Sequence, residues 1–389
     1  MKIGIFTETY EPYVSGVTTS IKMLKESLEK LGNEVYIVTV NLKEFKFYYD
    51  EFSKIIYIPG IKTGIYDARL TGIYSKKAFK IIKEWHLDII HSQTEFGVGY
   101  FSRIVSKKLH IPVVHTYHTL YEDYVYYVTH GHFNNLGKKI AINLTKYFCD
   151  KKCDALIVPT PKIKELFENK YNITRKINVI PTGIDTEKFQ IAQKDQNLLE
   201  LQKKYNITNK DFVIGSVGRI AIEKSFDKLI KHTKELIKEN KHIKLMIIGD
   251  GPETNNLKEL TKELKIEANV IFTGKVNYDL MPIYYNLFNI LVSFSTTETQ
   301  GLTIIEALAS SKPVLCINDE SFKQMITNNY NGYLFKDGKE YSKLVKRLIN
   351  NKELYNKLSK NALLSTAKYS KETFGQNVLN IYIKAKNSN

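Results

Sequence analysis

The sequence predicts an α/β protein built from two doubly wound parallel sheets, one in each of two domains. Short apolar runs alternate with amphipathic helical patterns along the chain, and this alternation is typical of parallel strands joined by crossover helices. The length of 389 residues also exceeds what one hydrophobic core usually supports. A break at Pro181-Thr182-Gly183 begins a polar tract that ends near Lys210, and we expect this tract to be the interdomain linker.

The N-terminal half opens with a strand, a polar loop, a helix and a second strand. Ser15 and Gly16 stand where this helix begins, and a glycine at this position lets a phosphate approach the backbone N–H groups. The alternative is an ordinary glycine at a helix start. The predicted strands are 2–6, 34–38, 88–91, 112–115, 155–158 and 177–180, and the predicted helices are 17–31, 74–85, 97–108, 136–152 and 161–170.

The C-terminal half repeats the alternation with a sheet of its own. Its predicted strands are 212–217, 244–248, 270–272, 290–293 and 314–317, with helices between them. A last helix is predicted over 371–386, after a turn near Tyr369 and Ser370. We therefore assign residues 1–190 to the first domain and 200–370 to the second.

Basic residues outnumber acidic ones, with 57 Lys and Arg against 41 Asp and Glu and a net charge of +16. This balance indicates an acidic partner: nucleic acid, nucleotide phosphates or an anionic bilayer. No apolar run has the length of a membrane span, and the polar start is unlike a secretory signal. We therefore expect a cytoplasmic protein with reduced cysteines. Cys149 and Cys153 are predicted to be buried thiols, because no histidine pair near them in the sequence completes a zinc set.

The loop before the predicted strand 314–317 carries two glutamates eight positions apart, Glu298 and Glu306. Gln300 to Thr303 would open a helix at the carboxyl end of a parallel strand, where backbone N–H groups can hold an anion such as a pyrophosphate. Glu298 would lie on the loop and Glu306 two turns into the helix on the same side. Carboxylates accept hydrogen bonds from sugar and ribose hydroxyls. The alternative is a solvated pair of glutamates on a helix face.

Arg219 and Lys224 follow the strand end Gly215-Ser216-Val217-Gly218. A guanidinium can bind two phosphate oxygens at once and an ammonium adds a point charge, so the pair is suited to a diphosphate. The glycine spacing matches neither a dinucleotide fingerprint nor a P-loop. No Asp-x-Asp follows a strand, so a metal-bridged diphosphate is not indicated. The alternative is two solvated surface cations.

His118 follows the predicted strand 112–115 in the run HTYHTLYEDY. It could donate a hydrogen bond to a sugar or orient an acceptor hydroxyl, and a purely structural histidine is the alternative. A zinc site made of His115, His118, His130 and His132 is disfavoured, because neither a cysteine nor a suitable ligand spacing accompanies them.

The predicted helix 74–85 places Tyr74, Ala78, Ile81 and Trp85 on one stripe, and Lys76, Lys77, Lys80 and Lys83 on or beside another. A basic amphipathic helix with an aromatic residue suits an anionic membrane surface. The alternative is a helix that packs on the sheet and exposes its lysines. A second basic helix with Lys138, Lys139, Lys146, Lys151 and Lys152, and the tyrosine-rich segment 121–127, lie in the same predicted domain.

The phrase STTETQGLTIIEALASSKPVLCI resembles the E-x7-E signature of the retaining glycosyltransferases of family 4. The opening GIFTETYEPYVSGV and the run HTYHTLYEDY resemble the bacterial diacylglycerol glucosyltransferases, and the similarity covers most of the chain. The resemblance implies the GT-B fold, two Rossmann-like doubly wound domains that face each other across a cleft. In this fold the last helix, about 371–389, packs back on the first domain.

The resemblance also implies roles for individual residues. His118, Glu298, Arg219 and Lys224 would be catalytic, and Lys76, Lys77, Lys80, Lys83 and Trp85 would bind the membrane. The nucleotide sugar would be bound by Gly16, Arg219, Lys224, Val276, Glu298, Gln300, Gly301, Leu302, Thr303 and Glu306. Val276 would lie against the nucleotide base.

The implied reaction is transfer, with retention, of an α-glucosyl residue from UDP-glucose to the 3-hydroxyl of 1,2-diacylglycerol at the inner membrane face. The expected partners are a UDP-sugar, diacylglycerol and an anionic membrane, without nucleic acid. No cofactor is expected to be required, and Mg²⁺ would at most stimulate. Alternatives are UDP-galactose as donor, another lipid or a soluble carbohydrate as acceptor, and a non-catalytic membrane scaffold. A nucleic-acid-binding protein is disfavoured, because no recognition module accompanies the scattered positive charge.

Overall fold

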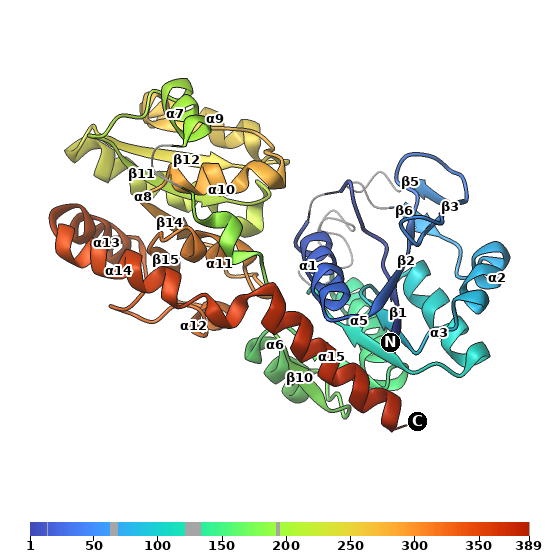
Figure 1. Ribbon diagram of the computed structural model, residues 1–389. Helices are drawn as coiled ribbons and strands as arrows, with labels where there is room; N and C mark the ends of the chain where they lie inside the picture. The colour runs from blue at the N-terminus through green and yellow to red at the C-terminus, as the bar shows by residue number, and fades with distance from the viewer. Residues whose placement is uncertain (14, 63–68, 121–133, 192–194, 389) are drawn as a thin grey trace. The chain divides into compact units, whose positions relative to one another are not determined.

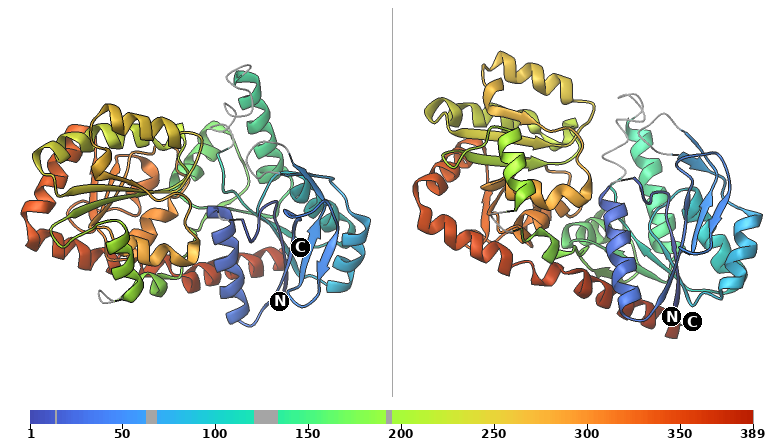
Figure 2. Two further views of the ribbon diagram at one scale, coloured as in Figure 1. Left: turned by 90° about the horizontal axis from the view of Figure 1, so that it is seen from above. Right: turned by 45° about the horizontal axis from the view of Figure 1, so that its top comes forward.

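The computed structural model describes residues 1–13, 15–62, 69–120, 134–191 and 195–388. The chain forms two compact units, Met1–Gly183 with Lys371–Asn389, and Ile184–Ser370 (Figures 1 and 2). The prediction of a linker after Gly183 is wrong. That tract contains the 3₁₀ turn Thr186–Phe189 and α7 (Gln196–Lys204), and Ile184, Phe189 and Leu198 are buried in the core of the second unit.

The first unit is built on an eight-stranded sheet in the order β10-β9-β8-β7-β1-β2-β4-β3, which is parallel except for the antiparallel β3. Its strands are β1 (Lys2–Phe6), β2 (Glu34–Val40), β3 (Tyr48–Asp50), β4 (Ile55–Ile58), β7 (Ile89–Ser92), β8 (Val113–Thr116), β9 (Ala155–Val158) and β10 (Ile177–Val179). A separate antiparallel ribbon consists of β5 (Gly60–Lys62) and β6 (Arg69–Thr71). Sequence analysis did not predict β3 to β6.

The helices of the first unit cover the two faces of this sheet. They are α1 (Gly16–Lys30), α2 (Lys76–Trp85), α3 (Gly97–Leu109), α5 (Asn134–Lys146), α6 (Pro161–Glu165) and α15 (Lys371–Asn387), with π-helical turns at Tyr147–Lys151 and Leu166–Lys170. Polar caps start two of them: Ser15 accepts from the N–H of Thr18, and Ser75 accepts from that of Ala78.

The final helix, α15, belongs to the first unit and packs on α1. Phe374 and Val378 share a buried cluster with Ile21 and Leu24. The two helices approach closely at Gly375, where an added Cβ would lie 2.1 Å from the Oγ of Ser27. A glycine is therefore required for this close contact.

The prediction that Trp85 binds the membrane is wrong. Its indole is only 5% exposed and shares a buried cluster with Ala78 and Ile82, so the apolar stripe of α2 faces the protein core. The Trp85 indole N–H donates to the hydroxyl of Tyr49 at 3.3 Å, and its ring lies 4.7 Å from that of Tyr36. Lys76, Lys77, Lys80 and Lys83 on α2 are exposed, as their prediction requires. Their contact with a membrane stays a prediction.

The second unit is built on a six-stranded sheet in the order β13-β12-β11-β14-β15-β16, parallel throughout. Its strands are β11 (Phe212–Val217), β12 (Ile243–Ile248), β13 (Val270–Phe272), β14 (Ile290–Ser293), β15 (Val314–Ile317) and β16 (Gly332–Phe335). Its helices include α7, α8 (Phe226–Glu239), α9 (Thr254–Glu263), α10 (Met281–Asn286), α11 (Leu302–Ala309), α12 (Glu320–Lys323), α13 (Gly338–Asn350) and α14 (Lys352–Leu364). Buried clusters line both faces of the sheet.

Candidate active site

The second sheet has a switch point between β11 and β14. From β11 the chain builds β12 and β13 on one side and later β14, β15 and β16 on the other. The loops after β11 and β14 therefore diverge, and ligands of open α/β sheets bind where such loops diverge. Arg219 and Lys224 follow β11, and Glu298 follows β14. The topology thus brings these three predicted residues to one edge of the sheet.

Two short ion pairs organise this edge. The Nζ of Lys224 lies 2.5 Å from Oε1 of Glu298, and the Nη2 of Arg219 lies 2.5 Å from Oε1 of Glu223. The Lys224–Glu298 pair joins the loop after β11 to the loop after β14. Sequence analysis missed Glu223, although its position four residues after Arg219 is the spacing of a helical ion pair. Each predicted cation is therefore held in place by a carboxylate.

Backbone is accessible beside these charges because glycines follow the strands. Gly218 and Gly249, at the ends of β11 and β12, have φ angles of 153° and 135°. A Cβ on Gly249 would lie 1.9 Å from the carbonyl oxygen of Gly218, so no side chain fits there. Gly301 precedes α11 with φ 81°, and Gln300 before it is buried. The N–H groups of Leu302 and Thr303 lie in the first turn of α11, where anions are favoured.

Glu306 lies little more than one turn into α11, so the prediction of two turns is wrong, because the helix begins only at Leu302. Its carboxyl is buried, and Oε2 accepts a hydrogen bond from the hydroxyl of Tyr285 at 2.6 Å. Burial raises the pKa of Glu306, while the hydroxyls of Tyr285 and Tyr278 act in the opposite direction. Glu306 is therefore rigidly placed rather than solvated.

The remaining predicted donor residues lie in two places. Val276 is half-buried in the loop after β13, following Gly274 with φ 72°. Gly16 is exposed as the first residue of α1 in the first unit. Their contact with a nucleotide stays a prediction.

The first sheet has its own switch point, between β1 and β7. β2 lies on the far side of β1, so the loops after β1 and β7 diverge. Glu8, in the loop after β1, donates its N–H to Thr94 at 3.0 Å and accepts at Oε1 from the N–H of Val98 at 2.6 Å. Burial raises the pKa of Glu8 to about 7, against the opposing effect of the α3 N–H groups, and Glu95 adds to the rise. Sequence analysis missed Glu8, although an acidic residue two positions after an N-terminal strand was the available signal.

His118 lies at the same edge, after β8. Its Nε2 is 2.6 Å from Oε1 of Gln93. Because an amide oxygen only accepts, Nε2 carries the proton and Nδ1 is an acceptor. Burial lowers the pKa of His118 to about 3, and the charge of His115 adds to the fall. His118 is thus neutral at physiological pH. Of the two predicted roles, orienting an acceptor hydroxyl fits this tautomer.

A buried polar network supports Gln93. His91 lies 2.6 Å from the hydroxyl of Tyr382 through Nδ1 and 2.7 Å from Thr116 Oγ1 through Nε2. The amide nitrogen of Gln93 lies 3.1 Å from Nδ1 of His91. The network ties His118 through β7 to the final helix α15.

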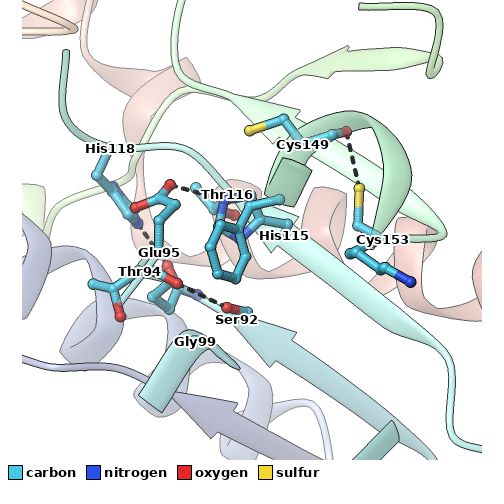
Figure 3. A network of polar contacts seen from close by, with 12 residues as sticks. Ser92, Thr94, Glu95, Gly99, His115, Thr116, His118, Cys149 and Cys153 are labelled. Carbon is cyan, nitrogen blue, oxygen red and sulfur yellow. Dashed lines mark hydrogen bonds and ion pairs between the residues drawn. The ribbon is translucent and has the colours of Figure 1, made fainter. Parts of the chain in front are cut away.

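Glu95, His115 and Cys149 form a buried group of metal-ligating types, with ligand atoms within 4.8 Å of one another (Figure 3). His115 Nε2 lies 2.8 Å from Glu95 Oε1. His115 is therefore a neighbour of Cys149, because β8 and the turn Tyr147–Lys151 bring residues distant in sequence together. The buried guanidinium of Arg103 supplies positive charge beside this carboxylate and thiol. His130, His132 and the segment 121–127 lie outside the described residues.

The cysteines fit their prediction. Cys149, Cys153 and Cys316 are free and buried. Burial raises the pKa of the Cys149 and Cys153 thiols, which keeps them protonated and unreactive.

We expect Gln93→Glu to move the acid limb of the pH–activity profile upward. A carboxylate in contact with Nε2 raises the pKa of an imidazole by about 1–3 from its present value. Protonated His118 has no acceptor at Nδ1, so activity would fall as the pH drops through the raised pKa. The measurement is kcat/KM for the hydroxyl acceptor between about pH 4 and 8, relative to wild type.

Gln93→Met is the matched control, since it removes the contact without adding charge and should lower activity evenly across pH. His115 on β8 and His91 on β7 also face His118 and are unchanged in both variants. Glu8 titrates in the same range in all three proteins. Superimposable normalised profiles for Gln93→Glu and wild type would refute the assigned tautomer.

Comparison with known proteins places this geometry in a family. A family model described as Glycosyltransferase Family 4 matches residues 14–188, and one described as Glycosyl transferases group 1 matches residues 199–364. The chain is 38% identical to the alpha-monoglucosyldiacylglycerol synthase of Streptococcus pneumoniae, over 86% of this chain and 75% of that protein. It is 35% identical to the alpha-monoglucosyldiacylglycerol synthase of Acholeplasma laidlawii, over 98% of this chain and 97% of that protein.

Solved structures agree on the fold. Sucrose-phosphate synthase from Thermosynechococcus elongatus matches with a TM-score of 0.77 at 18% identity, over the whole of both chains. Anabaena Alr3699/HepE in complex with UDP and glucose matches with a TM-score of 0.75 at 18% identity, over 99% of this chain and all of that one. The predicted GT-B fold is confirmed.

Proposed function

This chain belongs to glycosyltransferase family 4, and from that premise we propose that it transfers an α-glucosyl residue from UDP-glucose to the 3-hydroxyl of 1,2-diacylglycerol with retention. The product is a glycolipid. The observation that carries the proposal is the 35% identity, over 98% of this chain, to an alpha-monoglucosyldiacylglycerol synthase. The site agrees with it: cations, a helix N-terminus and fixed carboxylates converge at the switch point of the second sheet.

The leaving diphosphate is the centre of the proposed chemistry. Arg219, Lys224 and the first turn of α11 stabilise the negative charge that develops as the glycosidic bond breaks. Glu298 accepts from sugar hydroxyls and Glu306 from the ribose, with Val276 against the base and Gly16 near the phosphates. The acceptor attacks on the face from which UDP leaves, so no carboxylate nucleophile is needed. These cations act without a resident metal, and added Mg²⁺ can stimulate.

The first unit presents the acceptor in this proposal. His118 accepts a hydrogen bond from the diacylglycerol hydroxyl at Nδ1, which orients the hydroxyl oxygen for attack. No helix in the described part of the chain is long and apolar enough to span a bilayer. The enzyme binds the inner face of the cell membrane peripherally, with the exposed Lys76, Lys77, Lys80 and Lys83 near anionic headgroups.

The direct test incubates the purified protein with labelled UDP-glucose and vesicles that contain diacylglycerol. We expect labelled α-glucosyl-diacylglycerol, also with a chelator present. UDP-galactose in parallel decides the donor, and a soluble sugar acceptor decides the acceptor class. A protein that glucosylates only the soluble sugar would refute the lipid function.

Arg219→Ala and Lys224→Ala should each lower kcat about a hundredfold or more, because each removes a charge-assisted contact worth about 2–4 kcal/mol at the leaving group. Steady-state kinetics with both substrates measures the loss. Lys228→Ala is the control, since Lys228 is an exposed lysine of the neighbouring α8. Near-normal turnover in both variants would show that the diphosphate is bound elsewhere.

Replacing Lys76, Lys77, Lys80 and Lys83 together by glutamine should release the protein from anionic vesicles, most strongly at low salt. Each lysine near an anionic surface contributes about 1 kcal/mol of binding. Vesicle co-sedimentation measures the effect, and calorimetry should show unchanged UDP binding.

The control replaces Lys241, Lys258, Lys262 and Lys265, four exposed lysines of the second unit. If the first variant sediments like wild type at low salt, these lysines of α2 are only a solvated face.

A further inference from the structure

Lysines alone bind a bilayer weakly and in a salt-sensitive way. The apolar face of α2 is buried and cannot strengthen this binding. Trp85, Ala78 and Ile82 are buried inside the unit. Stable attachment of a peripheral protein requires apolar contact in addition to charge. Another element must supply that contact if the enzyme acts on a membrane lipid.

The β5–β6 ribbon has the required surface. Ile61 and Leu70 are directly opposite each other across its two strands, and they are 65% and 63% exposed. Cross-strand partners have Cβ atoms about 5 Å apart on the same face of a ribbon, so the two side chains form one apolar patch. Ile73, just after β6, is a further exposed apolar side chain at 56%.

The β5–β6 ribbon is anchored to the rest of the first unit, so the exposure of Ile61 and Leu70 does not result from a detached segment. Arg69 Nη1 donates to the carbonyl oxygen of Gly60 at 3.1 Å, within the ribbon. Its other amino group donates to the carbonyl oxygen of Leu42, which ties the ribbon to the loop after β2. A Cβ on Gly60 would lie 2.6 Å from Cγ1 of Val40, so the face around Gly60 is packed against the unit.

A short connection joins the ribbon to the basic helix α2. The ring of Tyr74 packs against those of Phe79 and Phe101, with centroids 5.9 and 5.8 Å away, and fixes the connection between β6 and α2. The Nζ of Lys108 lies 5.0 Å from the centroid of the same ring. Figure 1 shows the ribbon in the same part of the first unit as β3 and α2. Exposed Lys76 and Lys77 follow within a few residues.

We propose that Ile61, Leu70 and Ile73 enter the apolar layer of an anionic bilayer while the lysines of α2 bind its headgroups. The patch and the charge together match the two layers of a lipid surface, apolar below and anionic above. This inference rests on the proposed lipid-glucosylating function and specifies how that enzyme reaches its acceptor. It assigns the salt-resistant part of binding to the ribbon and the salt-sensitive part to α2.

The test is co-sedimentation with phosphatidylglycerol vesicles that contain diacylglycerol, at about 0.1 M and about 1 M salt. Wild type should stay partly bound at high salt, because apolar contact is not screened. The double variant Ile61→Thr, Leu70→Thr keeps residues that favour strands and should bind about tenfold more weakly at high salt. The control pair is Leu364→Thr, Ile383→Thr, two side chains that are also exposed, at 58% and 45%, and should bind like wild type.

Insertion is measured separately with Leu70→Cys carrying an environment-sensitive fluorophore. Its emission should shift to the blue on addition of vesicles. UDP affinity of every variant, measured by calorimetry, reports whether the second unit is intact, and circular dichroism reports on the whole fold.

Three results would overturn the inference: high-salt binding by the threonine pair equal to wild type, wild type fully released at high salt, or no blue shift. A wild-type dimer that the threonine pair converts to monomer would also do so, because a second copy would then be the occupant of the patch. Glucosyl transfer to diacylglycerol in detergent micelles is measured alongside. Failure of that transfer refutes the proposed function, whereas the vesicle results decide the ribbon.

Discussion

Parallel strands impose the constraint on which both units depend, because every crossover returns the chain to the same edge of the sheet. All carboxyl ends then meet there, and residues far apart in sequence become neighbours. Lys224 and Glu298 are 74 positions apart and form an ion pair across the switch point of the second sheet. In the first unit the same constraint places Glu8 and Thr94 in contact across 86 positions. Chemistry at these edges follows from topology rather than from local sequence.

The need of buried polar groups for hydrogen-bond partners is the second constraint on the structure of the first unit. A buried histidine must find partners, and His91 finds one in Tyr382, 291 positions away on the final helix. This makes α15 part of the support of Gln93 and, through it, of His118. A chain truncated before α15 would lose the cover of buried Ile21 and Leu24 and the partner of His91 together. The last helix is thus both core and positioning element.

The sequence alone was sufficient where burial leaves a simple pattern. The predicted ranges 2–6, 155–158, 212–217, 290–293 and 314–317 coincide with the strands, because central parallel strands read as continuous apolar runs. The strands β3, β5 and β6 pair antiparallel and lie outside the alternation of strands and crossover helices, so this alternation did not reveal them. The apolar stripe on α2 was recognised in the sequence. Such a stripe has the same sequence pattern whether it faces a protein core or a bilayer, and Trp85 faces the core. The proximity of His115 to Cys149 depends on tertiary structure and leaves no signal in the sequence spacing.

The ion pairs at the second switch point explain why the site needs both signs of charge. Two cations brought together near a sheet edge repel each other and would lose their positions if left to solvent. Glu298 pairs with Lys224 and Glu223 pairs with Arg219, and all four side chains are partly buried. These ion pairs offset the conformational entropy lost when the long cationic side chains are ordered. In the function proposed above, a diphosphate that engages Lys224 would compete directly with Glu298 for the same ammonium. Release of that carboxylate toward the sugar hydroxyls would then couple recognition of the phosphate to recognition of the sugar. One carboxylate can in this way order the cation in the free protein and read the sugar in the complex.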